Sequence, residues 1–405
     1  MRKVGSVSSA AVHNPVESLL ERYPHEVGDY EPQTRVVFGP GKIDCVGELA
    51  AETGGRRVLV VTDPHIVAVG HVARAISSLR SARLEPFVFD RVDENPTTRH
   101  VDACTAFARE ARIDLIVGLG GGSSMDCAKG CNFLLTNGGR MHDYWGVGKA
   151  AKPMLPMIAA PTTAGTGSEA QSFALIADEV THQKMACGDK KAACRVAILD
   201  PQLAATMPVS VAAATGIDAI SHAVETSVTT RRNSVSQMFS REAWRLLAAN
   251  FTASLGEPDN PDARGAMLLG AHFAGAAIEN SMLGATHACA NPLTATYGIT
   301  HGVAIGVMLP HVIRFNMPIA AADYADLLAL AGLAPNPGQS PGEALAHLIA
   351  EFVAASRQPE RLADCGVERS AIPKLAEQAT GQWTGKFNPR PLTQRDFEEL
   401  YTCAF

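Results

Sequence analysis

The chain has 405 residues and a formal net charge of −6. This length allows two or three domains of ordinary size, and the acidic balance, without a Lys/Arg-rich run, argues against a nucleic-acid-binding surface. No apolar stretch approaches the ~20 residues of a membrane span, and no apolar core follows the basic residues near the N-terminus, so the sequence predicts neither a membrane protein nor a secreted one. The nine cysteines show no pairing pattern and indicate reduced thiols in a cytoplasm.

The elements predicted along the chain divide it into three parts. Residues 1–30 carry no clear pattern and are predicted to be a surface extension. Over residues 31–206, short apolar runs alternate with helical patterns, which predicts an α/β domain with a mostly parallel sheet covered on both faces. The strands expected there are Val58–Val61, Leu84–Phe89, Leu115–Leu119, Met157–Ala160 and Val196–Leu199. Strand signals then stop, and alanine-rich helical periodicity predicts an all-helical domain over residues 207–405.

A glycine-rich turn follows the apolar run Leu115–Leu119. It reads Gly120-Gly121-Gly122-Ser123 and opens a predicted helix. Glycines let the backbone approach a phosphate closely, and the N–H groups at the following helix start point toward it. A tight turn without a ligand is the alternative. The order strand, glycines, serine and helix favours a pyrophosphate site, and so a dinucleotide-binding function for the first domain.

A second polar turn follows the apolar run Met157–Ala160. It contains Thr162, Thr163 and Thr166 among small residues. Threonine and serine also favour helix-capping turns, which is the structural alternative. Because the loops at strand ends are where open α/β sheets bind ligands, we expect these threonines to face a polar ligand.

Four residues of the second half form a candidate metal site. Asp218 and His222 are four residues apart, so on a helix they lie on the same face and can hold one ion between them. His287 and His301 follow downstream and complete a set of one carboxylate and three imidazoles. This donor set suits Fe²⁺ or Zn²⁺ and suits Ca²⁺ or Mg²⁺ poorly. For the Asp-x-x-x-His spacing alone, a pair on a helix surface is the alternative.

Together, these segments resemble the iron-containing alcohol dehydrogenase family, the group III alcohol dehydrogenases. The resemblance covers nearly the whole chain from about Arg35 onward. Besides the motifs above, it rests on Phe38-Gly39-Pro40-Gly41, Asn95-Pro96-Thr97, Asp200-Pro201, His301-Gly302 and Asn388-Pro389-Arg390. It implies a dehydroquinate synthase-like architecture, with an α/β dinucleotide-binding domain, an all-helical metal-binding domain and a substrate cleft between them.

The resemblance also implies an activity and a set of site residues. The activity is that of a metal-dependent NAD(H) alcohol dehydrogenase or aldehyde reductase acting on a small primary alcohol or aldehyde. The family's metal ligands correspond to Asp218, His222, His287 and His301, with Fe²⁺ as the ion and Zn²⁺ as the alternative. The residues implied for the dinucleotide are Asp63, Asn95, Gly121, Gly122, Ser123, Thr162, Thr163, Thr166 and Lys184. A homodimer or higher homo-oligomer is implied as well, with Arg35–Phe38 as a candidate for strand pairing between subunits.

Asp63 bears on the choice of cofactor. It follows the apolar run Val58–Val61, and a carboxylate at such a strand end accepts hydrogen bonds from the adenosine ribose and repels a 2′-phosphate. Family members that prefer NADP tend to have glycine at the position resembling Asp63. We therefore expect NAD rather than NADP. The structural alternative is that Asp63 caps the turn before Pro64.

Asn291 departs from the family pattern. The family commonly has His-x-x-x-His between its third and fourth ligands, and the second histidine is usually assigned to the proton path near the nicotinamide. Asparagine donates and accepts hydrogen bonds but does not titrate near neutral pH. The proton must then travel through water, cofactor hydroxyls or another group, and the substrate preference becomes an open question.

A few other side chains bear on the site. Phe173 and Ile278 resemble positions that line the substrate pocket, and their apolar character favours a small, weakly polar alcohol over a polyol. His272 lies on an apolar helix and His311 follows a proline. Each is interpreted as a core or helix-end histidine rather than as a site residue.

Alternative functions remain. A glycerol dehydrogenase-type polyol or hydroxy-acid dehydrogenase shares the metal-dependent chemistry, but its sites use fewer histidines. A dehydroquinate synthase-like lyase needs basic residues converging on a phosphate or on carboxylates, and residues 287–311 contain no such cluster. A non-catalytic binding protein would be free to lose an Asp–His cluster, which is costly to bury.

Overall fold

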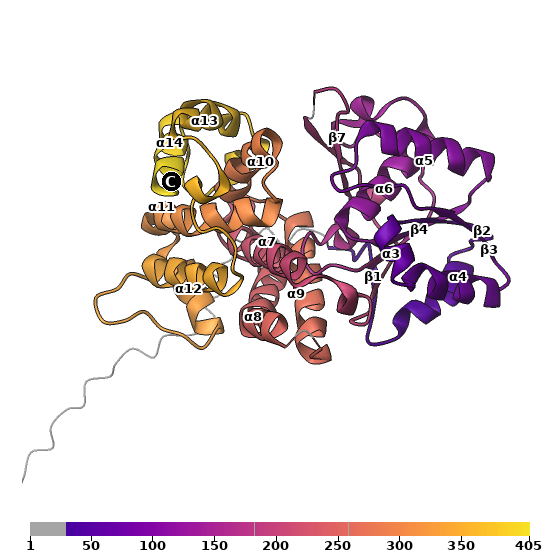
Figure 1. Cartoon of the computed structure of the whole chain (residues 1–405), viewed down its shortest axis with the longest axis horizontal. Coiled ribbons are helices and arrows are strands. Elements are labelled where there is room, and N and C mark those ends of the chain that lie inside the picture. Colours follow the sequence, from indigo (N-terminus) through magenta and orange to yellow (C-terminus); the bar gives the residue numbers. More distant parts are fainter. Residues whose placement is uncertain (1–29, 182, 258) are drawn as a thin grey trace, which may run out of the picture.

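The computed structural model describes residues 30–405 apart from 182 and 258, so the extension predicted for residues 1–30 lies outside the described residues except for Tyr30. The molecule has a half built on a sheet and a half built of helices (Figure 1). The last strand of the main sheet, β9 (Val196–Leu199), is followed after a short connection by the first long helix, α7 (Val209–Val228). The change from strands to helices thus occurs where it is predicted, while a domain boundary at residues 206/207 stays a prediction.

The main sheet has six strands, all parallel, in the order β1-β9-β6-β4-β2-β3. Besides β9, the strands are β1 (Arg35–Phe38), β2 (Arg57–Val61), β3 (Glu85–Phe89), β4 (Leu115–Gly120) and β6 (Met157–Pro161). The five predicted strands are confirmed, each within one residue at either end. The sheet is parallel and its central strands are buried, as expected of strands connected by helices.

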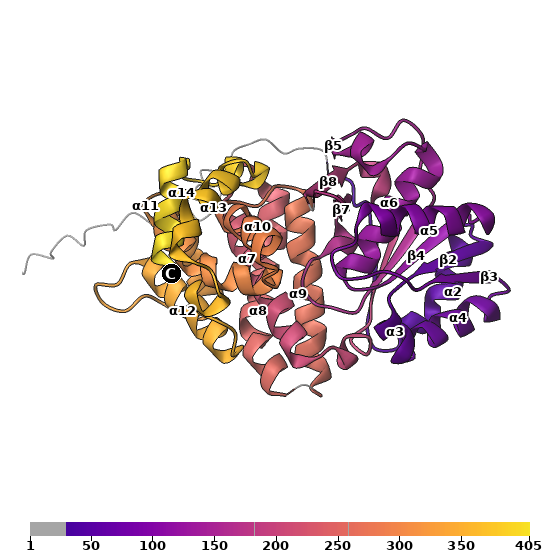
Figure 2. The same ribbon diagram turned by 45° about the horizontal axis from the view of Figure 1, so that its top comes forward.

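Helices cover both faces of this sheet (Figure 2). They are α2 (Val46–Glu52), α3 (Pro64–Ala68), α4 (His71–Ser81), α5 (Thr98–Glu110) and α6 (Gly122–Asn137). Successive side chains of β2 point to opposite faces. Leu59 and Val61 pack into one core with α5 and α6, while Val58 and Val60 pack into a second core with α2 and α4.

A second sheet of three strands also belongs to this half and was not predicted. It consists of β5 (Gly146–Val147), β7 (Phe173–Ala177) and β8 (Lys184–Gly188), with β7 and β8 antiparallel. Its strands are short, and only alternate residues of β7 are fully buried, so the apolar signal is weaker than in the main sheet. Short 3₁₀ helices complete this half: η1 (Lys42–Cys45), η2 (Met141–Tyr144), η3 (Ser168–Ala170), η4 (Lys190–Ala192) and η5 (Ala204–Thr206).

After Leu199, the described residues contain helices and no strand. After α7 come α8 (Ser234–Gly256), α9 (Pro261–Glu279), α10 (Ala285–Tyr297), α11 (His301–Leu330), α12 (Pro341–Ala355), η6 (Ala363–Cys365), η7 (Arg369–Ala371), α13 (Ile372–Thr380), η8 (Trp383–Phe387) and α14 (Gln394–Cys403). From Gly216 to Val228, every residue of α7 is buried. A helix that is buried all round lies in the centre of its domain, and the chemistry of this half is attached to it.

Among the described residues, α11 alone is long and apolar enough to cross a membrane. Of its most apolar window, 61% is buried inside the protein, and the helix is kinked at Ala320. Burial against other helices explains its apolar composition, so we interpret α11 as a core helix.

Candidate active site

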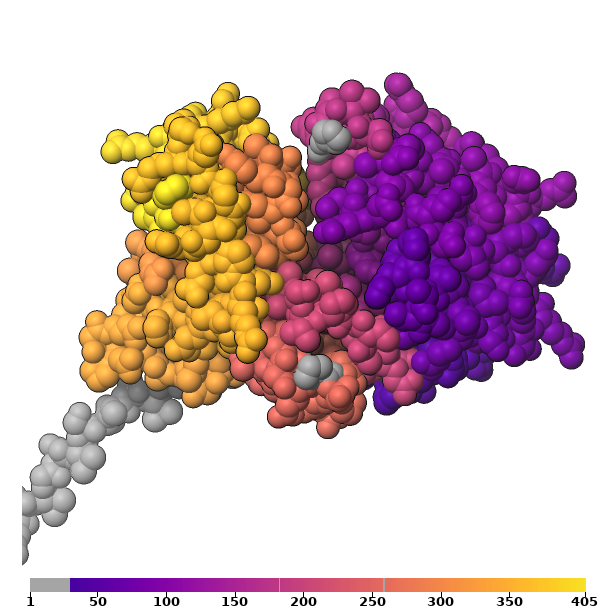
Figure 3. Space-filling model, viewed as in Figure 1, coloured from indigo at the N-terminus to yellow at the C-terminus, as the bar shows by residue number. Residues whose placement is uncertain are grey.

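A cavity of about 1750 Å³ lies between the two halves and is lined by both. The space-filling view shows the notch that separates the sheet half from the helical half (Figure 3). Small-molecule sites are commonly found in such clefts between domains. Every site residue predicted from the sequence lines this cavity: Asp63, Asn95, Gly121, Gly122, Ser123, Thr162, Thr163, Thr166, Lys184, Asp218, His222, His287 and His301.

The sheet half contributes the loops that follow its parallel strands. Asp63 follows β2, Asn95 follows β3, the glycine turn follows β4 and Thr162 follows β6. In the sheet, β2 lies between β3 and β4, so the next strand along the chain, β3, is added on one side of β2 and the following one, β4, on the other side. In open α/β sheets, this point at the carboxyl ends of the strands is where ligands bind.

Close packing explains two glycines of the turn. Gly120 has a φ of +152°, and a Cβ there would lie 2.4 Å from Ser124 Oγ. A Cβ on Gly122 would lie 2.8 Å from the side chain of Thr166, so glycine allows the two predicted ligand loops to touch. The helix α6 begins at Gly122 without a side-chain cap, which leaves its first N–H groups for a ligand.

Asp63 makes contacts that match its structural alternative. Its Oδ1 accepts a hydrogen bond from the backbone N–H of Ile66 at 3.0 Å and caps α3. Its Oδ2 faces the glycine turn and accepts a bond of 3.4 Å from Ser124 Oγ. Capping therefore uses one carboxylate oxygen and leaves the second at the cavity wall.

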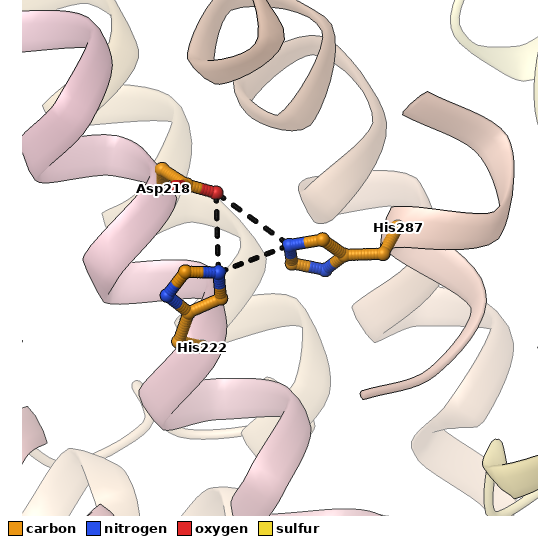
Figure 4. Close-up of side chains that lie close together, drawn as sticks. All are labelled: Asp218, His222 and His287. Atoms are coloured by element: carbon orange, nitrogen blue, oxygen red, sulfur yellow. Dashed lines mark hydrogen bonds and ion pairs between the residues drawn. The ribbon is translucent and has the colours of Figure 1, made fainter. Parts of the chain in front are cut away.

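The helical half contributes an Asp–His cluster from three helices. Asp218 and His222 come from α7, His287 from α10, and His301 is the first residue of α11. From Asp218 Oδ1, the distances to the Nε2 atoms are 3.3 Å for His222, 3.5 Å for His287 and 3.7 Å for His301. Figure 4 shows the first three residues pointing at one another. They are buried, whereas the His301 side chain is 29% exposed and forms the side open to the cavity.

The arrangement of these atoms fits a cation. Asp218 Oδ1 is buried and accepts no hydrogen bond. The Nε2 atoms of His222 and His287 face each other at 3.1 Å, a distance at which only one of them can carry the proton between them. One carboxylate oxygen and three imidazole nitrogens are a donor set for Fe²⁺ or Zn²⁺.

The electrostatics of three of the four residues, Asp218, His222 and His301, point the same way. Burial lowers the pKa of His222 to about 4 and that of His301 to about 3, so both imidazoles are neutral at pH 7 and have free lone pairs. Burial acts against ionisation of Asp218, but the surrounding histidines hold its pKa well below the usual range. His287 is different: burial is outweighed by Glu225 and Asp218, which raise its pKa to about 9.

Glu225 is a site residue that the sequence did not reveal. Its Oε2 lies 2.6 Å from His287 Nδ1, and its Oε1 accepts a hydrogen bond of 2.7 Å from the backbone N–H of Thr286. It is buried. A carboxylate on the far nitrogen of a histidine holds the proton there and turns the other nitrogen toward an ion. The spacing along the sequence could have indicated Glu225, because Asp218, His222 and Glu225 are at positions i, i+4 and i+7 and so lie on one helix face.

A buried network behind the glycine turn was also missed. The fully buried Lys129 Nζ donates to Ser168 Oγ at 2.8 Å and to the carbonyl oxygen of Phe173 at 2.9 Å. Ser168 Oγ in turn donates to Asp126 Oδ1 at 2.7 Å. Burial raises the pKa of Asp126, which lines the cavity. The network ties α6 to the loop after β6.

The interpretation of the two other histidines agrees with the structure. Neither His272 nor His311 lines the cavity. His272 is buried with its Nδ1 3.3 Å from Glu169 Oε1. Burial lowers the pKa of His311 to about 4.

The remaining wall of the cavity is aromatic and amide in character. Phe173 and Ile278 line it as predicted. The ring of Phe173 stacks on that of Trp383, with 6.0 Å between centroids and 29° between planes. Asn291 Nδ2 donates a hydrogen bond of 3.0 Å to Gln382 Oε1. Neither Trp383 nor Gln382 was identified from the sequence.

Comparison with known proteins covers nearly the whole chain. The family model for iron-containing alcohol dehydrogenase matches residues 32–201, and the model for the C-terminal part of the Fe-containing alcohol dehydrogenase family matches residues 212–405. The 1,3-propanediol dehydrogenase of Citrobacter freundii is 34% identical over 372 residues, which cover 91% of this chain and 96% of the relative. The NAD-dependent methanol dehydrogenase of Bacillus methanolicus is 32% identical over 371 residues, covering 91% and 97%.

Solved structures show the same relationship. A crystal structure of 1,3-propanediol oxidoreductase superimposes with a TM-score of 0.89 at 34% identity, covering 93% of this chain and 99% of the other. The sulfoacetaldehyde reductase from Bifidobacterium kashiwanohense in complex with NAD⁺ superimposes with a TM-score of 0.84 at 27% identity, covering 93% and 98%.

The fold, the cleft and these relatives define the class of protein, an oxidoreductase that acts on alcohols and aldehydes. The chain belongs to the iron-containing alcohol dehydrogenase family. The relatives are alcohol or aldehyde oxidoreductases by name, which supports the predicted alcohol dehydrogenase over the lyase alternative.

Proposed function

We propose that this protein is an Fe²⁺-containing, NAD(H)-dependent dehydrogenase that interconverts a small primary alcohol and its aldehyde. The observation that carries the proposal is the convergence of three imidazole nitrogens on one buried carboxylate oxygen, in the cavity that the glycine turn also lines. When bound, the ion polarises the oxygen of the alcohol or aldehyde as a Lewis acid, and the nicotinamide accepts or supplies the hydride. The protein holds and orients both groups.

The ion is assigned to Asp218, His222, His287 and His301. The first three are buried and close one side of the site, while His301 borders the cavity and leaves a side open for substrate. An open coordination position distinguishes a catalytic metal site from a structural one. The donor set accepts Zn²⁺ as well, and the name of the family supports Fe²⁺.

The dinucleotide is assigned to the loops of the sheet half. Backbone N–H groups at the start of α6 bind the pyrophosphate, because they lack a side-chain cap and face the cavity. Hydrogen-bonding groups around them are supplied by Asn95, Gly121, Gly122, Ser123, Thr162, Thr163, Thr166 and Lys184. Asp63 Oδ2 receives the adenosine ribose, which favours NAD over NADP. The relative named NAD-dependent methanol dehydrogenase supports the same choice.

The assembly is proposed to be a homodimer in the cytoplasm. β1 pairs with β9 in this chain and is the terminal strand of the main sheet. Val36 and Phe38 on it are 38% and 44% exposed, and an exposed apolar edge strand is a template for pairing with a second copy. The unpaired cysteines favour a reducing compartment.

Elemental analysis and one activity screen test this function. Anaerobically purified protein is expected to contain Fe²⁺ in preference to Zn²⁺ and to oxidise NADH in the presence of short aldehydes, faster than NADPH. Metal-replete protein that binds NADH but reduces no aldehyde in the screen would contradict the proposed activity. Retention of Zn²⁺ alone would contradict the choice of metal.

A further inference from the structure

The Asn388-Pro389-Arg390 motif near the end of the chain does not line the cavity. It follows η8 and is attached to α11, the helix that begins with His301. Arg390 Nη1 donates a hydrogen bond of 3.0 Å to the carbonyl oxygen of Phe315, and its guanidinium lies 3.9 Å from the centroid of the Phe315 ring. These contacts fix the motif on α11, with Asn388 buried.

Asn388 forms a reciprocal amide pair with Asn316 of α11. Asn316 Nδ2 donates to Asn388 Oδ1 at 2.9 Å, and Asn388 Nδ2 donates to Asn316 Oδ1 at 2.7 Å. Asn388 Nδ2 also donates to the carbonyl oxygen of Arg390 at 2.7 Å, so both of its N–H groups are used. Both asparagines are buried. The pair therefore holds the amide of Asn388 in one orientation.

The oxygen of this amide also bonds the start of α10. The N-cap residue of α10 is Gly284, which has no side chain to accept hydrogen bonds from the first N–H groups of the helix. Two buried residues from other elements accept them instead. Asn388 Oδ1 accepts from the Ala285 N–H at 3.3 Å. Glu225 Oε1 accepts from the Thr286 N–H at 2.7 Å. A Cβ on Gly284 would lie 3.1 Å from both of these oxygens, so glycine lets them reach the helix.

The first turn of α10 carries a proposed metal ligand. His287 follows Ala285 by two residues. Its Nε2 lies 3.5 Å from Asp218 Oδ1, and its Nδ1 lies 2.6 Å from Glu225 Oε2. Imidazole nitrogens bind Zn²⁺ at about 2.0–2.1 Å, and a sound site stays within about 0.2 Å of that distance. A larger shift of this turn therefore moves His287 out of range of an ion bound to Asp218.

We propose that Asn388 is a positioning residue for the metal ligand His287. Its amide, oriented by Asn316, caps α10 and acts on the imidazole through the backbone of the first turn. Hydrogen bonds thereby connect α11, α10 and α7, the three helices that supply the four ligands. The role rests on the proposed function, because it takes the cluster around Asp218 as the metal site.

Metal binding separates this role from a general contribution to stability. Metal-free protein is prepared from the parent and from Asn388→Leu, which keeps the branched shape of the side chain without its hydrogen-bonding atoms. Affinities for Co²⁺ and Zn²⁺ are measured by competition with a chelator, and the visible absorption of bound Co²⁺ reports its coordination geometry. Asn388→Leu is expected to bind both ions about 10-fold more weakly, the lower end of the effect of groups that orient a ligand, and to shift the Co²⁺ spectrum.

Asn132 of α6 provides the matched control. It is buried, its Nδ2 donates to the carbonyl oxygen of Leu155 at 2.8 Å, and its Oδ1 accepts from the Leu155 N–H at 3.0 Å. Asn132→Leu should lower the Tm of the metal-free protein, as Asn388→Leu does, but leave the Co²⁺ affinity and spectrum at the parent values. Should Asn388→Leu not fold, Asn388→Ser and Asn132→Ser replace the two variants, because serine is too short to reach the Ala285 N–H.

The outcomes separate the role of Asn388 from the assignment of the metal site. A folded Asn388 variant with the parent's Co²⁺ affinity and spectrum overturns the role, and so does an equal loss of metal affinity in the Asn132 variant. Parent protein that binds neither ion overturns the metal site itself, and the role fails with it. Because these affinities are measured without substrate, a failure of the proposed dehydrogenase activity is recognised separately, in the aldehyde screen.

Discussion

The two halves of the molecule present their functional groups to the cleft in different ways. In the sheet half, the groups at the cavity are largely backbone N–H groups and small side chains on loops, held by close packing such as that of Gly122 on Thr166. In the helical half, they are large side chains from separate helices in direct contact around Asp218. Single substitutions should therefore abolish a function in the helical half and alter a preference in the sheet half.

His287→Ala is expected to have the largest effect. The imidazole is one of three facing Asp218 Oδ1 and the one held by Glu225. Its removal should abolish metal binding and lower kcat/KM by more than the 10–100-fold typical of residues that only orient a ligand. Affinity for NADH should change little, because the dinucleotide is assigned to the other half.

Metal content, turnover and NADH binding are measured together for this variant. His347→Ala is the matched control, since His347 is exposed on α12 and its imidazole pairs with Glu351 on the helix surface. A His287→Ala protein with full metal content and full turnover would show that the ligand assignment is wrong. Equal loss of metal and NADH would show that the two halves do not act separately.

Glu225→Gln should weaken metal binding without removing it. Glutamine still offers an oxygen to the Thr286 N–H, but the charge that holds the proton on His287 Nδ1 is lost. The affinity for Fe²⁺ or Zn²⁺, measured by competition with a chelator, is expected to fall about 10–100-fold. Glu279→Gln is the control, because Glu279 bonds Ser172 across the two halves and does not contact the cluster. An unchanged metal affinity in Glu225→Gln would show that Glu225 serves only to cap the start of α10.

The contrast between loops that follow strands and side chains that meet from separate helices also explains how much of the structure could be predicted from the sequence. Continuous apolar runs such as Leu115–Leu119 predict buried parallel strands, and the Asp218/His222 spacing predicts two side chains on one helix face. Both depend on neighbours along the chain, and both agree with the structure. The small sheet was missed because β5 has only two residues and β7 alternates in burial.

Contacts between distant segments were not predictable in the same way. Glu225 meets His287 across 62 positions, and Asn291 meets Gln382 across 91. Neither partner has a local pattern that points to the other, because the packing of α7, α10 and η8 brings them together. The resemblance to a family supplied the four ligands and the loops, but the residues behind and beside them required the structure.

Asp63→Gly should alter a preference and leave the enzyme active. Without the carboxylate, repulsion of a 2′-phosphate disappears, and the ratio of kcat/KM for NADH over NADPH should fall by about 10-fold, the effect of ~1.4 kcal/mol. The lost cap of α3 costs only a few tenths of a kcal/mol when glycine replaces it, so the fold should be retained.

The control for Asp63 lies at the opposite end of the sheet. Asp114 accepts hydrogen bonds from the backbone N–H groups of Arg56 and Arg57, at the start of β2 and so at the end of this strand that is away from the cavity. Asp114→Gly should leave the cofactor ratio unchanged. If Asp63→Gly also leaves it unchanged, Asp63 serves only as the cap of α3.

Asn291→His should have the smallest effect. It places a titrating imidazole at a cavity position where the parent has an amide. An imidazole has an unperturbed pKa of ~6.5. In alcohol oxidation it must be unprotonated to accept a proton, so kcat/KM should gain a limb that rises with pH through the neutral range and is lost below it. A nearby divalent cation disfavours the charged imidazole and moves this limb to lower pH.

The measurement compares pH profiles of kcat/KM for one alcohol, with saturating NAD and a fixed metal content. Parent enzyme with Asn291 should lack the neutral limb, since the amide that contacts Gln382 does not titrate. A parent profile that already contains the limb, unchanged in the variant, would show that another group carries the proton. Asp126 is then the next side chain to replace, because it is a carboxyl group at the cavity wall and its burial raises its pKa.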